Sequence, residues 1–131
     1  MSKILTEISA GELLDKLSIL EIKLNKINDP VLLNEVKKEY EILDETKSRN
    51  IKFSKEIDSH YKDLKENNKK LWKLINELRL CVKNSDFKEK FTQLSKDIYI
   101  ANDKRFKIKS EINKILDSNI KEVKQPSVCD T

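Results

Sequence analysis

This 131-residue sequence contains very little glycine, proline, histidine and tryptophan. There is one glycine (Gly11), one histidine (His60), one tryptophan (Trp72) and two prolines. With a single glycine, the chain cannot build the glycine-rich loops that cradle phosphates in P-loop and dinucleotide-binding proteins. It also lacks the residues that tight β-hairpin turns require. These absences argue against nucleotide-binding α/β folds and against proteins built from β-hairpins.

Side chains that commonly catalyse reactions or bind metal ions are also scarce. His60 lies in a stretch rich in lysine and aspartate that we expect to be exposed, so no base for a nucleophilic triad is evident. The two cysteines, Cys81 and Cys129, lack the spacing of a zinc site. We expect both to be free thiols in a reducing compartment. The sequence therefore predicts no metal and no cofactor, and it favours a protein that is not an enzyme without excluding one.

Long apolar runs are missing as well. No stretch approaches the roughly 20 apolar residues that span a bilayer, and the opening residues MSKILTEIS have no signal-peptide core. We therefore expect a cytoplasmic protein with no membrane partner. The 27 basic and 23 acidic residues give a net charge of +4. Because acidic residues interrupt the lysines, this charge favours a solvated surface over a nucleic-acid-binding one.

What the sequence has in abundance is leucine, isoleucine, lysine and glutamate, which suit long helices. Apolar residues recur at spacings of three and four, the period of one helix face. Ser9 with Glu12 has the pattern of a capping box, and Asp29 can cap a helix whose first residue is Pro30. The pattern predicts a single helical domain over residues 1–119, with helices over about residues 10–28, 30–48, 51–83 and 86–118. An unbroken helix from residue 30 to residue 82 is the alternative.

The last two predicted helices are about equally long and only a few residues join them, so they should form an antiparallel hairpin. The predicted fold class is all-α, an elongated antiparallel helical bundle built on this hairpin. Residues 3–8 and 120–123 alternate loosely in polarity, so a short two-stranded β element could join the two ends. Residues 120–131 form a tail, expected to be disordered in part. A thin bundle leaves apolar surface such as Ile19 and Ile22 near solvent, and this predicts a homodimer.

One polar residue interrupts the apolar seam of each long predicted helix: Asn68 in the first and Arg105 in the second. Folding the hairpin about its turn places Ala101 opposite Asn68, so the two polar residues lie at neighbouring levels, flanked by Trp72. An arginine cannot lose its charge, and a buried charge without a partner is costly. A carboxylate should therefore meet Arg105.

Two carboxylates of the first predicted helix are candidates for that partner, and Glu21 lies at the edge of its seam. Glu21 is the first choice and Asp15 the second, and Asn68 could accept another guanidinium proton. The cluster is either a polar layer that fixes the register of the bundle or a ligand pocket. The structural interpretation is favoured. Alternatively, the Arg105 side chain could extend out of the seam into solvent.

Three segments together resemble an uncharacterised family of short helical proteins from bacteria and their phages. They are SAGELLDKLSILEIKLNKI, ENNKKLWKLINELR and FTQLSKDIYIANDKRFKIKSEINKIL. The family pattern reads G-E-L-x-D-K-x-x-I-L-E-I-K, then N-x-x-L-W, then N-D-x-R-x-x-x-K-x-x-I-N, and the resemblance runs from Ile4 to about Val123. After Trp72 the sequence lacks the acidic pair that the family often has. The resemblance implies no established activity, but it implies a shared set of polar residues: Glu12, Asp15, Lys16, Glu21, Lys23, Asn102, Asp103 and Arg105.

We expect a non-enzymatic helical binding or scaffold protein that acts through helix faces on an unidentified protein partner. The first alternative is a bundle that binds a small ligand or anion at a polar site around Arg105. The candidate binding residues are Arg105, Glu21, Asn68, Asp15, Lys16, Lys23, Trp72, Asn102 and Asp103. Weak nucleic-acid binding through lysine-rich faces ranks third. The stretch ELLDKLSILEIKL also bears a faint likeness to the first helix of all-helical chorismate mutases, but it lacks their arginines.

Overall fold

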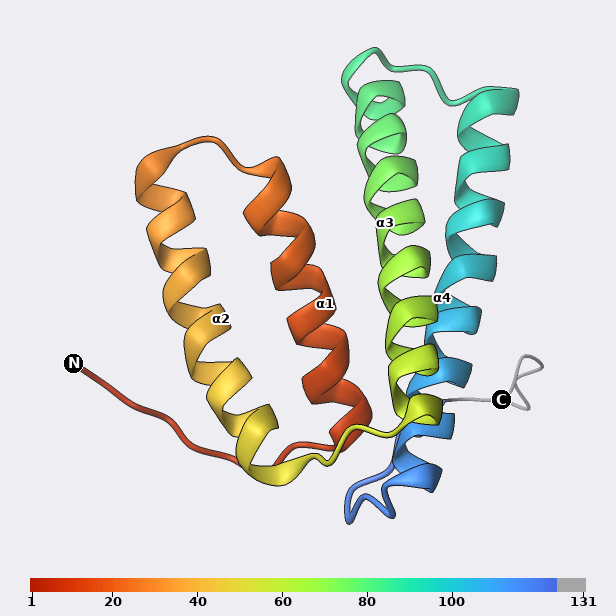
Figure 1. Cartoon of the computed structure of the whole chain (residues 1–131). Coiled ribbons are helices and arrows are strands. Elements are labelled where there is room, and N and C mark those ends of the chain that lie inside the picture. Colours follow the sequence, from red (N-terminus) through yellow and green to blue (C-terminus); the bar gives the residue numbers. More distant parts are fainter. Residues whose placement is uncertain (125–131) are drawn as a thin grey trace.

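The computed structural model describes residues 1–124, which form four helices and no strand (Figure 1). The helices are α1 (Ala10–Lys26), α2 (Pro30–Asn50), α3 (Lys55–Lys83) and α4 (Glu89–Ile115). The all-α class and the order of the helices agree with the prediction. Residues 51–54 separate α2 from α3, so the alternative of one helix through this region is wrong. Within residues 1–124, no helix is both long enough and apolar enough to cross a membrane.

The first two helices begin at the capping residues that the sequence predicts. The Ser9 side chain accepts a hydrogen bond from the backbone N–H of Glu12 at 3.1 Å, and Asp29 caps α2, which begins at Pro30. Glu12, which would complete the predicted capping box, instead accepts a hydrogen bond from Lys109 of α4 at 2.6 Å. The start of α1 is therefore tied to α4.

Left-handed backbone follows the end of each long helix, and at Asp117 it explains why α4 ends before residue 118. Ser85 has φ 53° in the turn before α4, and Asp117 has φ 48° just after its end. A non-glycine residue in this region of φ does not continue a right-handed helix. Asp86, the expected cap of α4, accepts a hydrogen bond from the backbone N–H of Lys88 at 3.3 Å and so belongs to the turn.

Two antiparallel hairpins, α1 with α2 and α3 with α4, lie side by side (Figure 1). α1 lies in the middle and contacts α2 on one side and both α3 and α4 on the other. Of the helices, α2 packs only against α1, and it has no buried residue. The α3–α4 hairpin is the longer one, and its turn extends beyond the end of α1 (Figure 1).

The apolar core lies where α1 packs against the α3–α4 hairpin. Its buried residues are Leu13, Leu14, Leu17, Ile57, Leu64, Ile108 and Ile112. Cys81 is a buried free thiol, whereas Cys129 and the end of the predicted tail lie outside the described residues. Ile22 is only 2% exposed, and it faces the α3–α4 hairpin together with Ile19. Of the two residues that suggested a homodimer from the sequence, Ile22 is thus buried within one chain and Ile19 is half-buried.

The predicted two-stranded β element is wrong, because the described residues contain no strand. The two ends of the chain do meet, but they meet through side chains. Asn119 donates to Glu7 at 2.6 Å, and Ser9 donates to Glu122 at 2.8 Å. Alternating polarity over so few residues fits an extended segment as well as it fits a strand. Here the tail reaches the capped end of α1 and forms side-chain contacts there.

Candidate functional site

Arg105 of α4 lies against Asp15 of α1. Its Nε donates to Oδ1 of Asp15 at 2.8 Å, and its Nη2 donates to Oδ2. Asp15 is completely buried, with 0% exposed, whereas the Arg105 side chain keeps 30% of its surface exposed. Two parallel hydrogen bonds fix the plane of the guanidinium group. Of the two carboxylates predicted to meet Arg105, Asp15 is the partner and Glu21 is not.

Gly11 allows α1 to come close enough to α4 for this contact. Its backbone N–H donates to Oδ1 of Asn113 at 2.7 Å, and a Cβ at this position would lie 2.6 Å from the carbonyl oxygen of Lys109. Only a residue without a side chain fits that distance. Asp15 follows one helical turn later on the same face, so it is held directly against α4.

Asn68 and Ser18 complete the surroundings of the buried carboxylate. The amide of Asn68 donates to Oδ1 of Asp15 at 2.9 Å and to the Ser18 hydroxyl at 2.8 Å. Asn68 thus binds the carboxylate, where the sequence suggested that it would accept from the guanidinium. The hydrogen bond to Asp15 raises the pKa of Arg105 above its ordinary value, although burial acts in the opposite direction. Both partners of this buried pair are therefore well satisfied.

Glu21 belongs to a different cluster, between α1, α2 and α3. It pairs with Lys65 at 2.8 Å and accepts a hydrogen bond from the Tyr40 hydroxyl at 3.4 Å. Burial, followed by the charge of Glu21, raises the pKa of both Tyr40 and Tyr61 above the ordinary value of tyrosine. This cluster joins three helices and does not include Arg105.

Three more of the predicted site residues lie away from Arg105. Asp103 pairs with Lys124 near the end of the described chain. Lys16 is exposed and Lys23 is half-buried on α1, and neither lines the pocket that opens beside Arg105. The structure therefore gives no support to these two lysines as cationic contacts of one site.

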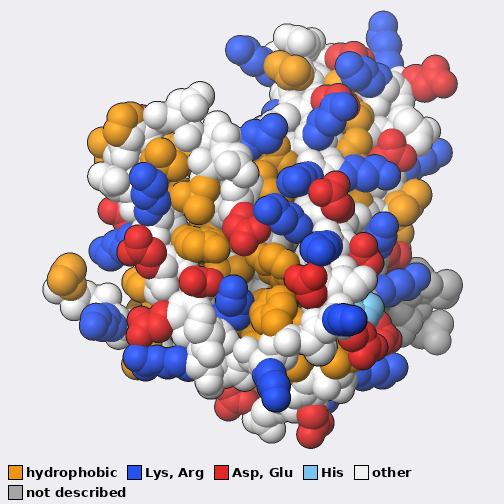
Figure 2. Space-filling model, viewed as in Figure 1, with side chains coloured by type: hydrophobic (Ala, Val, Ile, Leu, Met, Phe, Trp, Pro, Cys, Tyr) orange, Lys and Arg blue, Asp and Glu red, His pale blue; other side chains and the backbone are white. Residues whose placement is uncertain are grey.

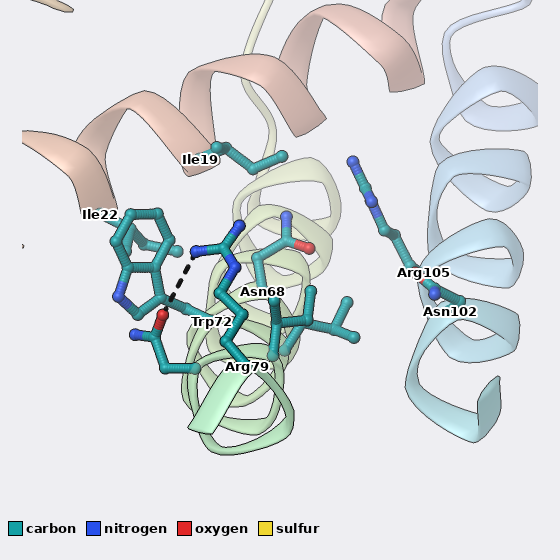
Figure 3. A pocket seen from close by; sticks show the side chains of 10 residues that line it. Ile19, Ile22, Asn68, Trp72, Arg79, Asn102 and Arg105 are labelled. Atoms are coloured by element: carbon teal, nitrogen blue, oxygen red, sulfur yellow. Dashed lines mark hydrogen bonds between the residues drawn. The ribbon is translucent and has the colours of Figure 1, made fainter. Parts of the chain in front are cut away.

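A pocket of about 220 Å³ opens beside the Asp15–Arg105 pair, between α1, α3 and α4 (Figure 3). It brings together four of the predicted residues, which are Asn68, Trp72, Asn102 and Arg105. The remaining lining residues were not predicted as site residues: Ile19, Ile22, Leu71, Ile75, Asn76 and Arg79. The pocket thus has apolar walls and several polar side chains, the usual composition of a small-ligand site.

Arg79 brings a second guanidinium group to this pocket. Figure 3 shows its side chain folded back between Trp72 and Asn68, while Arg105 extends from α4 toward α1. The Nη1 of Arg79 donates to Oδ1 of Asn76 at 3.5 Å, a long bond that holds the side chain only weakly. Arg79 is therefore free to turn toward a bound group.

The spacing along α3 could have revealed Arg79 from the sequence. Asn68, Trp72, Ile75 and Arg79 follow one another at intervals of four, three and four, so they lie on one face of the helix. Arg79 lies beyond the apolar seam, on the exposed part of the same face, so a polar interruption of the seam does not indicate it. The alignment of Arg79 with the one tryptophan is the signal that does.

The free edge of Arg105 gives the pocket its chemistry. Asp15 accepts from Nε and Nη2, and no acceptor in residues 1–124 bonds to Nη1. A guanidinium group matches the geometry of a carboxylate or phosphate, and an indole ring offers a flat apolar face. Within residues 1–124, no three His, Cys, Asp or Glu side chains are grouped to hold a metal ion. The arrangement can bind an anion with an apolar part.

The chain belongs to DUF6165, a family of unknown function, whose pattern matches residues 4–128. This match confirms the expected membership of an uncharacterised family. Comparison with the curated proteins and with the solved structures found no match. Membership of this family therefore indicates no activity, and a functional proposal has to be argued from the pocket.

Proposed function

We propose that this chain is a non-enzymatic binding protein and that its ligand is a small organic anion held between α1, α3 and α4. The observation that carries the proposal is that Arg79, Arg105 and Trp72, from two different helices, line one pocket. In the proposed complex, the acid group of the ligand accepts hydrogen bonds from Nη1 of Arg105 and from Arg79. The apolar part of the ligand packs against Trp72.

The pair with Asp15 suits Arg105 to this role. Because two hydrogen bonds already fix the guanidinium group, a ligand meets a donor that is in place before binding. Asp15 neutralises the charge of Arg105, so the uncompensated positive charge at the pocket comes from Arg79. Arg79 is exposed and makes no ion pair within residues 1–124. A ligand with one negative charge complements this site.

The scaffold protein that the sequence favoured, which binds a partner through helix faces, becomes the second candidate. Three large apolar residues near the turn of the α3–α4 hairpin are exposed: Leu80, Val82 and Phe87. Scattered exposed apolar residues are common on soluble proteins, whereas converging guanidinium groups are not. We therefore rank the anion site first, and we keep the cytoplasm as the expected location of either kind of protein.

The fluorescence of Trp72 can test the anion site directly, because Trp72 is the only tryptophan in the chain. We expect benzoate to change the emission in a saturable way, with a dissociation constant between about 1 μM and 1 mM. Benzamidine has the same ring but a positive charge, so it should not bind. Arg79→Gln should weaken benzoate binding about tenfold, as expected for a lost charged hydrogen bond.

Arg49→Gln is the matched control for this experiment. Arg49 is also exposed, but it lies on α2, where it pairs with Glu45. We expect this variant to bind benzoate like the unmodified protein. Equal affinities in the Arg79→Gln variant and the unmodified protein would contradict the proposal, as would equal responses to benzoate and benzamidine.

A further inference from the structure

A larger groove continues from the anion pocket toward the turn of the α3–α4 hairpin. Its volume is about 620 Å³, and it shares Ile22, Trp72 and Asn76 with the inner pocket. Figure 2 shows the surface hollowed between the ends of the two hairpins, with Lys and Arg side chains along the α3 side of the hollow. Because the two spaces share part of their walls, one ligand can extend from the inner pocket into the groove.

The sizes of the two spaces argue for a single extended ligand. Small-ligand sites usually enclose about 300–1,000 Å³. The inner pocket alone, at about 220 Å³, is smaller than that, whereas the groove at about 620 Å³ lies within the range. The inner pocket is lined by the guanidinium groups, and the groove has apolar side chains at Ile22, Trp72 and Leu80, with polar side chains between them. An acid group fits the first and an apolar chain fits the second.

The charges around the groove favour an anion over a cation. Lys26, Lys69 and Lys73 line it, against one acidic residue, Glu77. Lys69 pairs at 3.3 Å with Glu66, and both side chains are exposed, so this pair is weak. The groove therefore has a positive potential, which attracts anionic ligands and repels cationic amphiphiles.

We infer that the ligand is an extended amphipathic anion, such as a carboxylate with a medium-length alkyl chain; this inference rests on the proposed function. The acid group lies between Arg79 and Arg105, and the chain runs over Trp72 toward Leu80. The distance along α3 from Trp72 to Leu80 is about 12 Å, given the rise of about 1.5 Å per helical residue. An alkyl chain of intermediate length spans that distance.

A series of alkyl carboxylates tests the inference. Acetate, hexanoate, octanoate and decanoate are titrated below their micelle-forming concentrations while Trp72 emission is recorded. We expect affinity to rise roughly twofold to fourfold for each methylene that enters the groove, as burial of apolar surface predicts. The gain should stop when the chain reaches beyond Leu80. Decylamine, with the same chain and a positive charge, should not bind.

Two variants at the end of α3 locate the chain. Leu80→Ser removes an apolar side chain that is 58% exposed, so it should leave the fold intact. We expect it to remove most of the gain between octanoate and decanoate and to leave hexanoate binding unchanged. Val82→Ser is the matched control, because Val82 is also an exposed apolar residue of α3 but does not line the groove.

The outcomes separate this inference from the proposal on which it rests. Binding that depends on Arg79 but not on chain length would overturn the inference and leave the small-anion site standing. No Arg79-dependent binding of any carboxylate would overturn both. A response to an acidic amphipathic peptide but not to alkyl carboxylates would overturn the inference and assign the groove to a protein partner.

Discussion

At the scale of single residues, Arg105 has a structural role as the partner of Asp15, and the binding role that we propose for it would use a different part of the same group. Its Nε and Nη2 neutralise Asp15, which has no contact with solvent. Its remaining nitrogen, Nη1, has no acceptor within residues 1–124, and Arg105 lines the pocket. The contact with Asp15 fits the polar layer that the sequence suggested, and the proposed ligand site would use the nitrogen that this contact leaves free.

The structural role predicts a large loss of stability in Arg105→Leu. Removal of the arginine leaves the Asp15 carboxylate buried without a positive partner, which costs about 3–5 kcal/mol. Adding Asp15→Asn removes the uncompensated charge and should recover much of this loss. Urea unfolding followed by circular dichroism measures both effects. Lys104→Leu, at an exposed position of α4, serves as the control and should change stability by less than about 0.5 kcal/mol.

Unfolding of Arg105→Leu at the same urea concentration as the unmodified protein would show that Asp15 does not depend on Arg105. A double variant as unstable as the single one would show that the loss comes from packing. Either result would contradict the structural role of the ion pair.

The raised pKa of Tyr61 predicts that the folded chain loses stability at alkaline pH. Burial and then Glu21 raise the pKa of Tyr61 in the folded chain, whereas an unfolded tyrosine ionises near pH 10. Above about pH 10 the unfolded state therefore binds fewer protons than the folded state, so stability falls as pH rises. Below that pH the contribution is fully present. Tyr61→Phe should show a smaller drop in melting temperature between pH 8 and pH 11.

The exposed Tyr99 provides the comparison for that measurement. Tyr99→Phe should lose stability at alkaline pH as steeply as the unmodified protein. If the two variants show the same pH dependence, the burial of Tyr61 does not contribute to it.

The residues of the site were predictable where a polar side chain interrupts an apolar seam, as at Asn68 and Arg105. The choice of Asp15 over Glu21 was not, because it depends on the rotation of α1 about its axis. Asp15 lies roughly 120° around the helix from Glu21, on the face of Gly11 and Ile22 opposite the predicted leucine seam. The contact of Gly11 with α4 sets that rotation, and it depends on two helices far apart in the sequence. Periodicity within one helix holds no such information.

At the scale of helices, Gly11 is where α1 and α4 come closest. Gly11→Ala would place a methyl group 2.6 Å from the Lys109 carbonyl oxygen, so the two helices must move apart. Alanine favours a helix over glycine by about 1 kcal/mol, but overpacking typically costs about 1–3 kcal/mol. We expect net destabilisation in thermal unfolding, together with weaker anion binding as Asp15 shifts.

Lys16→Ala is the control within the same helix, because Lys16 is exposed. It should leave the melting temperature nearly unchanged. A Gly11→Ala variant that is more stable than the unmodified protein would mean that the helices separate at no cost.

The starts of the helices could be predicted from local sequence signals more reliably than their ends. Ser9 and Asp29 marked the starts of α1 and α2 because a cap acts on the next few residues only. The end of α4 comes earlier than predicted because Asp117 adopts left-handed backbone, as Ser85 does after α3. In each case the backbone N–H of the next residue bonds back to the helix, Ser118 to Asn113 and Asp86 to Cys81. Serine and aspartate are weaker signals for such an end than glycine, so the sequence pattern did not fix it.

At the scale of the whole molecule, the groove exists because the two hairpins differ in length. α1 has 17 residues and α3 has 29, so α3 continues beyond the point where α1 ends. The sequence predicts a long hairpin and two shorter helices. It does not predict which face of α3 stays open, because that depends on how one hairpin packs against the other.

The predicted homodimer now requires a different surface. Ile22 is buried and Ile19 is half-buried within the chain, whereas Val82 and Phe87, near the turn of the α3–α4 hairpin, are exposed. We propose that two copies associate through these turns. A stable interface usually buries about 800 Å² of each partner. A single turn offers a small area for such an interface, so we expect the dimer to dissociate at low micromolar concentration.

Light scattering over a range of concentrations tests this expectation. The unmodified protein should shift from monomer to dimer as its concentration rises through the micromolar range. The double variant Val82→Ser with Phe87→Ser should remain monomeric, because it removes the exposed apolar side chains of the turn. Ile42→Ser, at an exposed apolar position on α2, should dimerise like the unmodified protein. A monomer at every concentration would reject the dimer, and a dimer that persists in the double variant would move the interface away from the turn.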